Sequence, residues 1–140
     1  MAHPKFLDQP PRFLFFTGKG GVGKTSLACA TAITLADAGQ RVLLVSTDPA
    51  SNVGQVFGMI IGNTITAISS VPSLAALEID PQAAAQIYRD RIVNPVRGIL
   101  PDTVVKGIEE QLSGACTTEI AAFDEFTALL VDSALTAEYD

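Results

Sequence analysis

The sequence has 140 residues, of which 48% are hydrophobic and 17% are charged, so it is long enough for one domain with a core and too apolar for a disordered chain. Nine Lys and Arg stand against fifteen Asp and Glu, giving a formal charge of −6. No Lys/Arg cluster supplies the basic face that a nucleic-acid binder needs, and we expect no nucleic-acid partner.

Residues 1–11 contain prolines and charges but no apolar segment, which excludes a secretory signal and indicates a lead-in. The uncharged run 49–77 is broken by Pro, Gly and Asn, so it does not have the pattern of a membrane-spanning helix. Cys29 and Cys116 form neither a disulfide framework nor a Cys-x-x-Cys knuckle. These features predict a cytoplasmic protein whose residues 12–140 belong to one α/β domain.

The apolar run 12–17 is typical of a buried parallel strand, and the glycine-rich segment 18–26 follows it directly. Residues 27–38 are apolar nearly all round, which predicts a helix packed on a sheet with Gly39 just past its end. A second buried strand is predicted over 41–46. Strand, glycine loop, helix and strand together predict a βαβ unit of a doubly wound, mostly parallel sheet.

The remaining elements are predicted from weaker signals. Residues 77–79 alternate and indicate a short edge strand, and Asp80 with Pro81 is typical of a helix start that leads to about Val93. A helix is predicted from about 101–102 to near Gly114, and another from Thr117 or Thr118 onward.

The end of that last helix admits a second interpretation. Leu129 to Asp132 fits the three apolar residues and Asp of a Walker B strand. It also continues the helical face begun at Ile120 and Phe123 with no turn signal between them. We therefore interpret it as helix.

The segment GKGGVGKTS satisfies two fingerprints. Gly18-x-Gly20-x-x-Gly23 is the dinucleotide-binding pattern, and Gly18-x-x-x-x-Gly23-Lys24-Thr25 is the phosphate-binding P-loop. The Lys-Thr pair favours the P-loop, because a triphosphate with magnesium needs an ammonium and a hydroxyl that a dinucleotide does not. A Rossmann site and a glycine-rich turn that binds nothing are the alternatives.

In a P-loop, successive backbone N–H groups converge on phosphate oxygens at the positive end of a helix. Lys24 would bridge the β- and γ-phosphates of ATP, and the Thr25 hydroxyl would take one Mg²⁺ position. The predicted nucleotide-binding residues are Gly18, Lys19, Gly20, Gly21, Val22, Gly23, Lys24, Thr25 and Ser26.

Asp48 follows the second predicted strand by two residues. A carboxylate at the carboxyl end of a parallel strand beside a P-loop can lie next to the γ-phosphate, where hydrolysis needs a positioned water. Asp48 is therefore a predicted catalytic residue. The alternative is a local Asx turn made with Pro49.

Lys19, directly after the first glycine, is not needed by an ordinary P-loop. With it, the segment resembles the deviant-Walker ATPases, which include the nitrogenase iron protein, the septum-positioning ATPase, the tail-anchored-protein targeting factor and the arsenical pump ATPase. The resemblance implies that Lys19 reaches across an interface to a second unit's nucleotide and assists catalysis together with Lys24. The alternative is a solvated surface lysine.

The segments at 42–58 and 77–84 are similar to the arsenical pump ATPases and their targeting-factor relatives. GACTTEIAAFDEFTALL at 114–130 resembles the bacterial pump ATPases in particular, with Cys116 where that family places a metalloid ligand. The similarity runs from about Phe13 to the end. It implies an N-terminal portion of a longer protein, with a Walker-B-like strand following after Asp140 and a second P-loop half, or a homodimer partner, completing the site.

The resemblance further implies ATP hydrolysis that energises arsenite or antimonite efflux through a membrane-embedded pump subunit, at the cytoplasmic face of the membrane, with the metalloid as activator. An ATP-gated carrier for tail-anchored membrane proteins is the alternative. A carrier needs a Met-rich or apolar groove, and the chain has only Met1 and Met59. A nucleotide-binding fragment that does not hydrolyse ATP is a further alternative, and we expect the fragment alone to be inactive.

The two cysteines are assigned different roles. Cys116 lies in a small-residue turn before a predicted helix, where a thiol is reachable. The family resemblance implies that it is a ligand for arsenite or antimonite, which are thiophilic. Ordinary core packing is the alternative for Cys116. Cys29 lies between two alanines in the apolar helix and is predicted to be a small buried hydrophobe.

Overall fold

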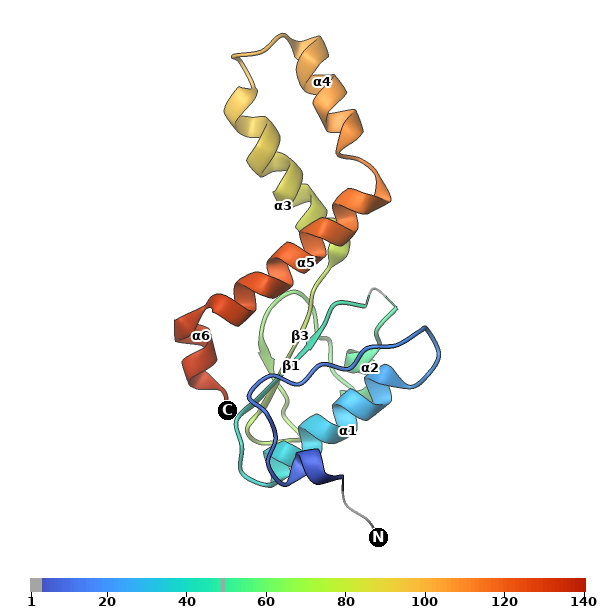
Figure 1. Cartoon of the computed structure of the whole chain (residues 1–140), viewed down its shortest axis with the longest axis vertical. Helices are drawn as coiled ribbons and strands as arrows, with labels where there is room; N and C mark the ends of the chain where they lie inside the picture. Colours follow the sequence, from blue (N-terminus) through green and yellow to red (C-terminus); the bar gives the residue numbers. More distant parts are fainter. Residues whose placement is uncertain (1–3, 49) are drawn as a thin grey trace.

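The computed structural model describes residues 4–48 and 50–140 and shows a sheet-containing body with a helical arm rising from it (Figure 1). In chain order the elements are η1 (Lys5–Leu7, a 3-10 helix), α1 (Lys24–Asp37), β1 (Val42–Ser46), α2 (Val53–Phe57), β2 (Thr66–Ala67), β3 (Leu74–Glu78), α3 (Pro81–Val93), η2 (Asn94–Val96, also 3-10), α4 (Asp102–Gln111), α5 (Ala115–Val131) and α6 (Ser133–Glu138). Within these residues no helix combines the length and apolar character needed to cross a bilayer.

The sheet has three strands in the order β1-β3-β2. β1 runs parallel to β3 with Ser46 opposite Glu78 at their carboxyl ends, and the short β2 runs antiparallel to β3. The predicted strand 41–46 is confirmed. The prediction of an edge strand at 77–79 is wrong, because Leu77 and Glu78 end the central strand β3, whose first four residues are buried, and Ile79 follows it.

Helix α1 packs against the sheet through small side chains. Cys29, Ala32 and Ala36 belong to one buried cluster with β3 residues Leu74 and Ala76. The helix ends in a Schellman motif: the N–H of Gly39 donates to the carbonyl of Ala36, and the N–H of Gln40 donates to that of Leu35. Gly39 has φ +92°, so the predicted glycine after the helix is confirmed.

The arm consists of α3 and α4, with α5 crossing between the arm and the body (Figure 1). The Asp80 carboxylate caps α3 by accepting from the N–H groups of Gln82 and Ala83. Ala84, Ala85 and Ala121 form a buried cluster that brings α3 and α5 close together. The helices predicted for α3, α4 and α5 are confirmed, but Gly114 caps α5 in place of the predicted Thr117 or Thr118, and α4 ends at Gln111.

The interpretation of the segment 129–131 as helix is confirmed, because α5 continues to Val131, and the Walker B alternative is wrong. Asp132 then caps α6 by accepting from the N–H of Leu135. The Asp of this segment therefore serves as the cap of a helix.

The prediction of a buried strand over 12–17 is also wrong. These residues have no regular secondary structure, and Phe13 and Phe15 are 44% and 56% exposed. β3 pairs with one edge of β1, and the other edge has no strand partner among the described residues. A cavity of about 1010 Å³, lined by residues 12–17, β1 and α5, separates the segment from that edge. Because no neighbouring strand is within reach, the apolar run cannot form the inter-strand hydrogen bonds of a sheet.

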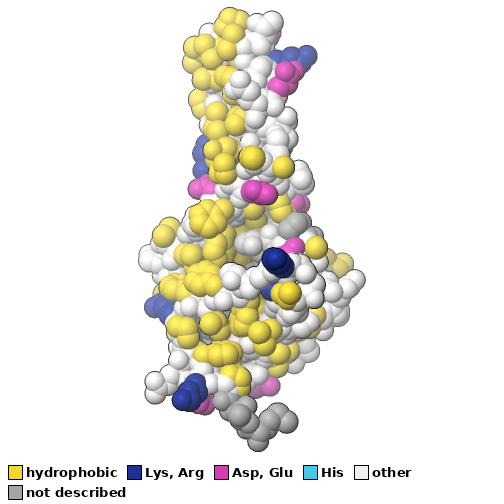
Figure 2. All heavy atoms as spheres, turned by 45° about the vertical axis from the view of Figure 1, so that its right-hand side comes forward, with side chains coloured by type: hydrophobic (Ala, Val, Ile, Leu, Met, Phe, Trp, Pro, Cys, Tyr) yellow, Lys and Arg dark blue, Asp and Glu magenta, His cyan; other side chains and the backbone are white. Residues whose placement is uncertain are grey.

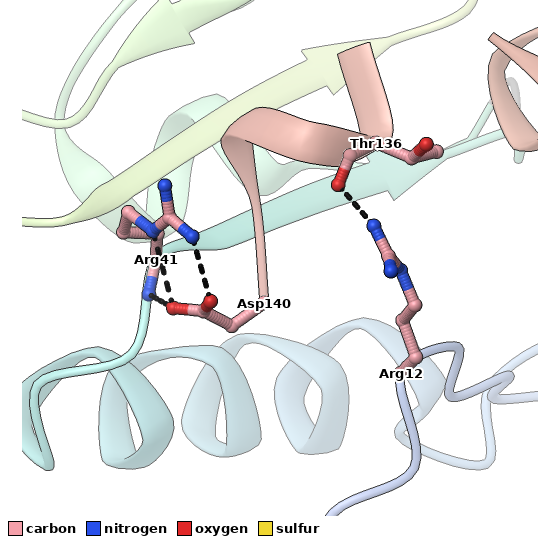
Figure 3. Close-up of polar contacts among 4 residues, drawn as sticks. All are labelled: Arg12, Arg41, Thr136 and Asp140. Carbon is pink, nitrogen blue, oxygen red and sulfur yellow. Dashed lines mark hydrogen bonds and ion pairs between the residues drawn. The ribbon is translucent and has the colours of Figure 1, made fainter. Parts of the chain in front are cut away.

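The start of β1 is tied to the end of the chain (Figure 3). The Arg41 N–H donates to Asp140 Oδ2 at 2.8 Å, its guanidinium donates to Asp140 Oδ1 at 2.8 Å, and the Asp140 N–H donates to the Arg41 carbonyl at 2.7 Å. These hydrogen bonds lower the pKa of Asp140 to about 2. Beside them, the Arg12 guanidinium donates to the carbonyl of Thr136.

Candidate phosphate-binding loop and its surroundings

The glycine loop connects the segment 12–17 to α1. Its predicted nucleotide-binding residues lie together: Gly18, Lys19, Gly20, Gly21, Val22 and Gly23 are exposed in the loop, and Lys24, Thr25 and Ser26 form the first turn of α1. Gly23 is the N-cap with φ +91°, a left-handed conformation that favours glycine. A glycine cap has no side chain to accept from the first-turn N–H groups, so they remain available to an anion.

Lys24 folds back over the loop, where its Nζ donates to the carbonyl of Lys19 at 3.2 Å. The ammonium is therefore held beside the exposed backbone of the loop, at the amino end of a fourteen-residue helix. The helix dipole and the ammonium add positive potential at the same place, which suits a polyphosphate. Lys19 itself is exposed in the loop.

Three predicted residues meet at one cavity. Lys24, Thr25 and Asp48 all line the cavity of about 1010 Å³. The exposed loop residue Lys19 and the α5 residue Cys116 are not among its lining residues. The structure thus places Lys24, Thr25 and Asp48 on the wall of one cavity, while Lys19 contacts Lys24 from outside that wall and Cys116 lies elsewhere on α5.

Asp48 is partly buried, and its geometry is that of an Asx turn. Its Oδ1 accepts from the N–H of Ala50 at 2.9 Å, and its carbonyl accepts from the N–H of Ser51 at 2.9 Å. Its own N–H donates to Ser46 Oγ at 3.3 Å. The Asx turn that the sequence offered as an alternative is therefore present, while Pro49, its other predicted member, lies outside the described residues. The turn engages one carboxylate oxygen, so a catalytic role would fall to the other.

Sequence reasoning missed Glu78, which closes β3. Its Oε1 accepts from Ser51 Oγ and from the N–H of Gly54, each at 3.3 Å. The signal that could have found it was a carboxylate at the carboxyl end of a buried strand, the same signal that identified Asp48.

The cysteines differ as predicted in exposure. Cys29 is 2% exposed, and burial, with a smaller contribution from the charge of Glu78, raises the pKa of its thiol. Its prediction as a buried hydrophobe is confirmed. Cys116 is a free, exposed thiol at the second residue of α5. Among residues 4–48 and 50–140, no group of three or more His, Cys, Asp or Glu side chains is placed to hold a metal ion.

Comparison with known proteins adds the family. A family model for anion-transporting ATPases matches residues 11–140. The chain belongs to this family. It is 72% identical over 136 residues to an arsenical pump-driving ATPase of Escherichia coli and 69% identical over 136 residues to one of Acidiphilium multivorum, covering 97% of this chain in each case. It is 35% identical over 132 residues to the ATPase get3 of Schizosaccharomyces japonicus, covering 89% of this chain.

Family membership confirms the predicted α/β P-loop fold. The chain spans 23% of the length of the two pump-driving ATPases and 41% of the get3 protein. The similarity to pump-driving ATPases, stronger than that to get3, agrees with the resemblance expected from the segment 114–130.

Proposed function

We propose that this chain supplies an ATP- and Mg²⁺-binding P-loop to an ATPase that energises arsenite or antimonite efflux. The observation that carries the proposal is the meeting of Lys24, Thr25 and Asp48 at one cavity beside an uncapped helix N-terminus. Backbone N–H groups of residues 18–26 bind phosphate oxygens, Lys24 neutralises charge on the β- and γ-phosphates, and the Thr25 hydroxyl ligates Mg²⁺.

Asp48 is the proposed water-positioning residue. Its Oδ1 is held by the N–H of Ala50, which fixes the carboxylate plane and leaves Oδ2 to accept from an attacking water. A carboxylate oriented in this way before substrate arrives supplies positioning without reorganisation during the reaction.

Residues 12–140 are proposed to be one incomplete P-loop domain. β1 has an open edge, Phe13–Thr17 is apolar without a strand partner in the described chain, and both line the same cavity. These features fit a sheet that accepts another strand between them. A second nucleotide-binding unit, either another P-loop half or a second copy, would receive Lys19, whose exposure in the loop leaves its side chain able to reach outward.

The metalloid role is proposed for Cys116. Its thiol is exposed at the amino end of α5, and a soft trivalent centre needs further thiolates from elsewhere in the complete protein. Binding there would draw two units together and complete the shared nucleotide site. The efflux partner is a membrane-embedded pump subunit, which places this protein at the cytoplasmic face of the membrane.

The test is the ATPase rate of the complete protein with and without antimonite, for wild type, Cys116→Ser and the control Cys29→Ala. We expect metalloid stimulation in wild type and Cys29→Ala, and its loss in Cys116→Ser with basal hydrolysis retained. Stimulation that survives in Cys116→Ser would remove the ligand role. Hydrolysis indifferent to metalloid in wild type would favour a carrier of membrane proteins.

A further inference from the structure

The loop that carries Asp48 is attached to the body at both ends. At its start, Asp48 bonds to Ser46, the last residue of β1. At its end, Val53 is 2% exposed and lies in the same buried cluster as Cys29 of α1. Asp48 and Val53 are therefore each fixed to the body, and the position of Ser51 between them depends on what holds the second attachment.

Glu78 supplies hydrogen bonds near Val53, where the end of the loop is attached to the body. β1 and β3 are parallel with Ser46 opposite Glu78, so both strands deliver a side chain to the same end of the sheet. One Glu78 oxygen accepts from Ser51 Oγ and from the Gly54 N–H, each at 3.3 Å. Ser51 also donates its N–H to the Asp48 carbonyl at 2.9 Å. Glu78 is thus connected to Asp48 through one residue, Ser51.

The backbone next to this contact is tightly packed. A β-carbon on Gly54 would lie 2.6 Å from the carbonyl oxygen of Met59, so no side chain fits there without a backbone shift. The Gly54 N–H is consequently held at a fixed place at the start of α2, with the Glu78 oxygen as its acceptor. The Glu78 carboxylate thus holds Ser51 and Gly54 through two hydrogen bonds from one oxygen.

We propose that Glu78 is a positioning residue for hydrolysis, which acts by holding Ser51 and Gly54 so that Asp48 faces the reacting phosphate. The inference rests on the proposed function, since it assigns Glu78 a part in the ATPase reaction. Glu78 does not contact nucleotide in this scheme. It sets where Asp48 sits, and a displacement of about 1 Å at such a group costs up to about 100-fold in rate.

The test measures kcat, KM for ATP and thermal stability of the complete protein for Glu78→Ala, Glu78→Gln and Ser51→Ala. Glu78→Ala removes the acceptor, and we expect kcat to fall about 10- to 100-fold with KM for ATP within about threefold of wild type. Glu78→Gln keeps an acceptor oxygen and should restore most of the rate. Ser51→Ala removes one of the two contacts and should lower kcat about three- to tenfold.

The matched control is Glu109→Gln. Glu109 is also a partly buried glutamate; it lies on α4, in the arm, and accepts from the Arg97 guanidinium. Its kcat should stay at the wild-type value.

A double-mutant cycle with Asp48→Asn separates positioning from general stability. If Glu78 acts through Asp48, Glu78→Ala should have little further effect on kcat once Asp48 is replaced. Equal effects of Glu78→Ala in both backgrounds would overturn the proposal, as would a normal kcat in Glu78→Ala. If Glu78→Ala does not fold, Ser51→Ala decides, and an unchanged kcat there overturns the proposal. A wild-type protein that hydrolyses no ATP would instead overturn the proposed function.

Discussion

The glycine loop and the Asp48 loop line the same end of the domain but are built differently. The glycine loop is exposed over residues 18–23, and the Lys24 side chain reaches back to it by donating to the Lys19 carbonyl. The Asp48 loop is held by Ser46, by Glu78 and by the buried Val53. One loop offers backbone to a ligand, and the other holds a carboxylate in place without one.

This difference separates binding from turnover. The glycine loop is completed by the phosphates it binds, so changes there should act first on nucleotide affinity. Asp48, Ser51 and Val53 are already held by protein contacts, so changes at these residues should act on the reaction after binding. Figure 2 shows hydrophobic side chains on the surface of the body and along the arm.

The largest effect is expected at Lys24. Lys24→Ala removes the ammonium held over the loop, and a lost charge-assisted contact to phosphate of about 3 kcal/mol corresponds to about 100-fold weaker ATP binding. Calorimetric titration of the complete protein with ATP and Mg²⁺ measures this. Lys106→Ala, on the exposed surface of α4, is the control and should bind normally. Unchanged ATP binding in Lys24→Ala would refute the P-loop assignment.

Asp48→Asn tests whether the Asp48 loop acts on turnover and not on nucleotide binding. Asparagine keeps an oxygen for the N–H of Ala50 and so preserves the turn, but it cannot act as a carboxylate toward water. We expect kcat to fall about 100-fold or more, with ATP affinity within about threefold. Steady-state hydrolysis and equilibrium binding on the same preparation separate the two. Asp80→Asn, a helix cap on α3, is the control. Weakened binding with normal turnover would contradict the role.

The two loops also differ in what the sequence predicted. The P-loop was predicted residue by residue, because spacing alone fixes which backbone groups face the phosphate. Asp48 was predicted from its place after a strand, and its Asx turn was the alternative because Pro49 follows it. Glu78 was missed, because its partners Ser51 and Gly54 are more than twenty residues away and only the parallel register of β1 and β3 brings them together.

The predicted strand at 12–17 failed for a related reason. Apolar composition predicts that the side chains of a segment will be buried. A strand forms only where the backbone of a neighbouring strand is available for hydrogen bonding. Phe15 instead packs edge-on against Phe126 of α5, with ring centroids 5.9 Å apart. Helices with clear end signals were predicted well, because their hydrogen bonds are local: Asp80 and Gly39 mark a start and an end that the structure confirms. The short helices α2 and α6 were not predicted.

A smaller effect is expected when a β-carbon is introduced at a glycine of the loop that has a positive φ. Gly23→Ala places a β-carbon at φ +91°, which costs about 1–2 kcal/mol, and it should lower stability and ATP affinity together. Gly114→Ala is matched to it, because Gly114 also caps a helix but has φ −78° and open space around its Cα. Chemical denaturation of both variants measures the difference. Equal stability in the two would show that the observed loop conformation carries no strain.

The smallest effect is expected at the opposite end of β1, where the attachment is an exposed ion pair. Arg41 bonds to Asp140 and lowers the pKa of that carboxyl from 3.8 to about 2. Because the pKa is lowered on folding, the stabilisation is present above pH 3.8 and disappears as the pH falls toward about 2. Arg41→Ala should therefore melt slightly below wild type at pH 7, and the two melting temperatures should converge near pH 2. Arg91→Ala, which breaks the exposed pair with Asp124 on the arm, is the comparison. A difference between wild type and Arg41→Ala that persists unchanged at pH 2 would assign the effect to lost packing of the arginine stem and not to the ion pair.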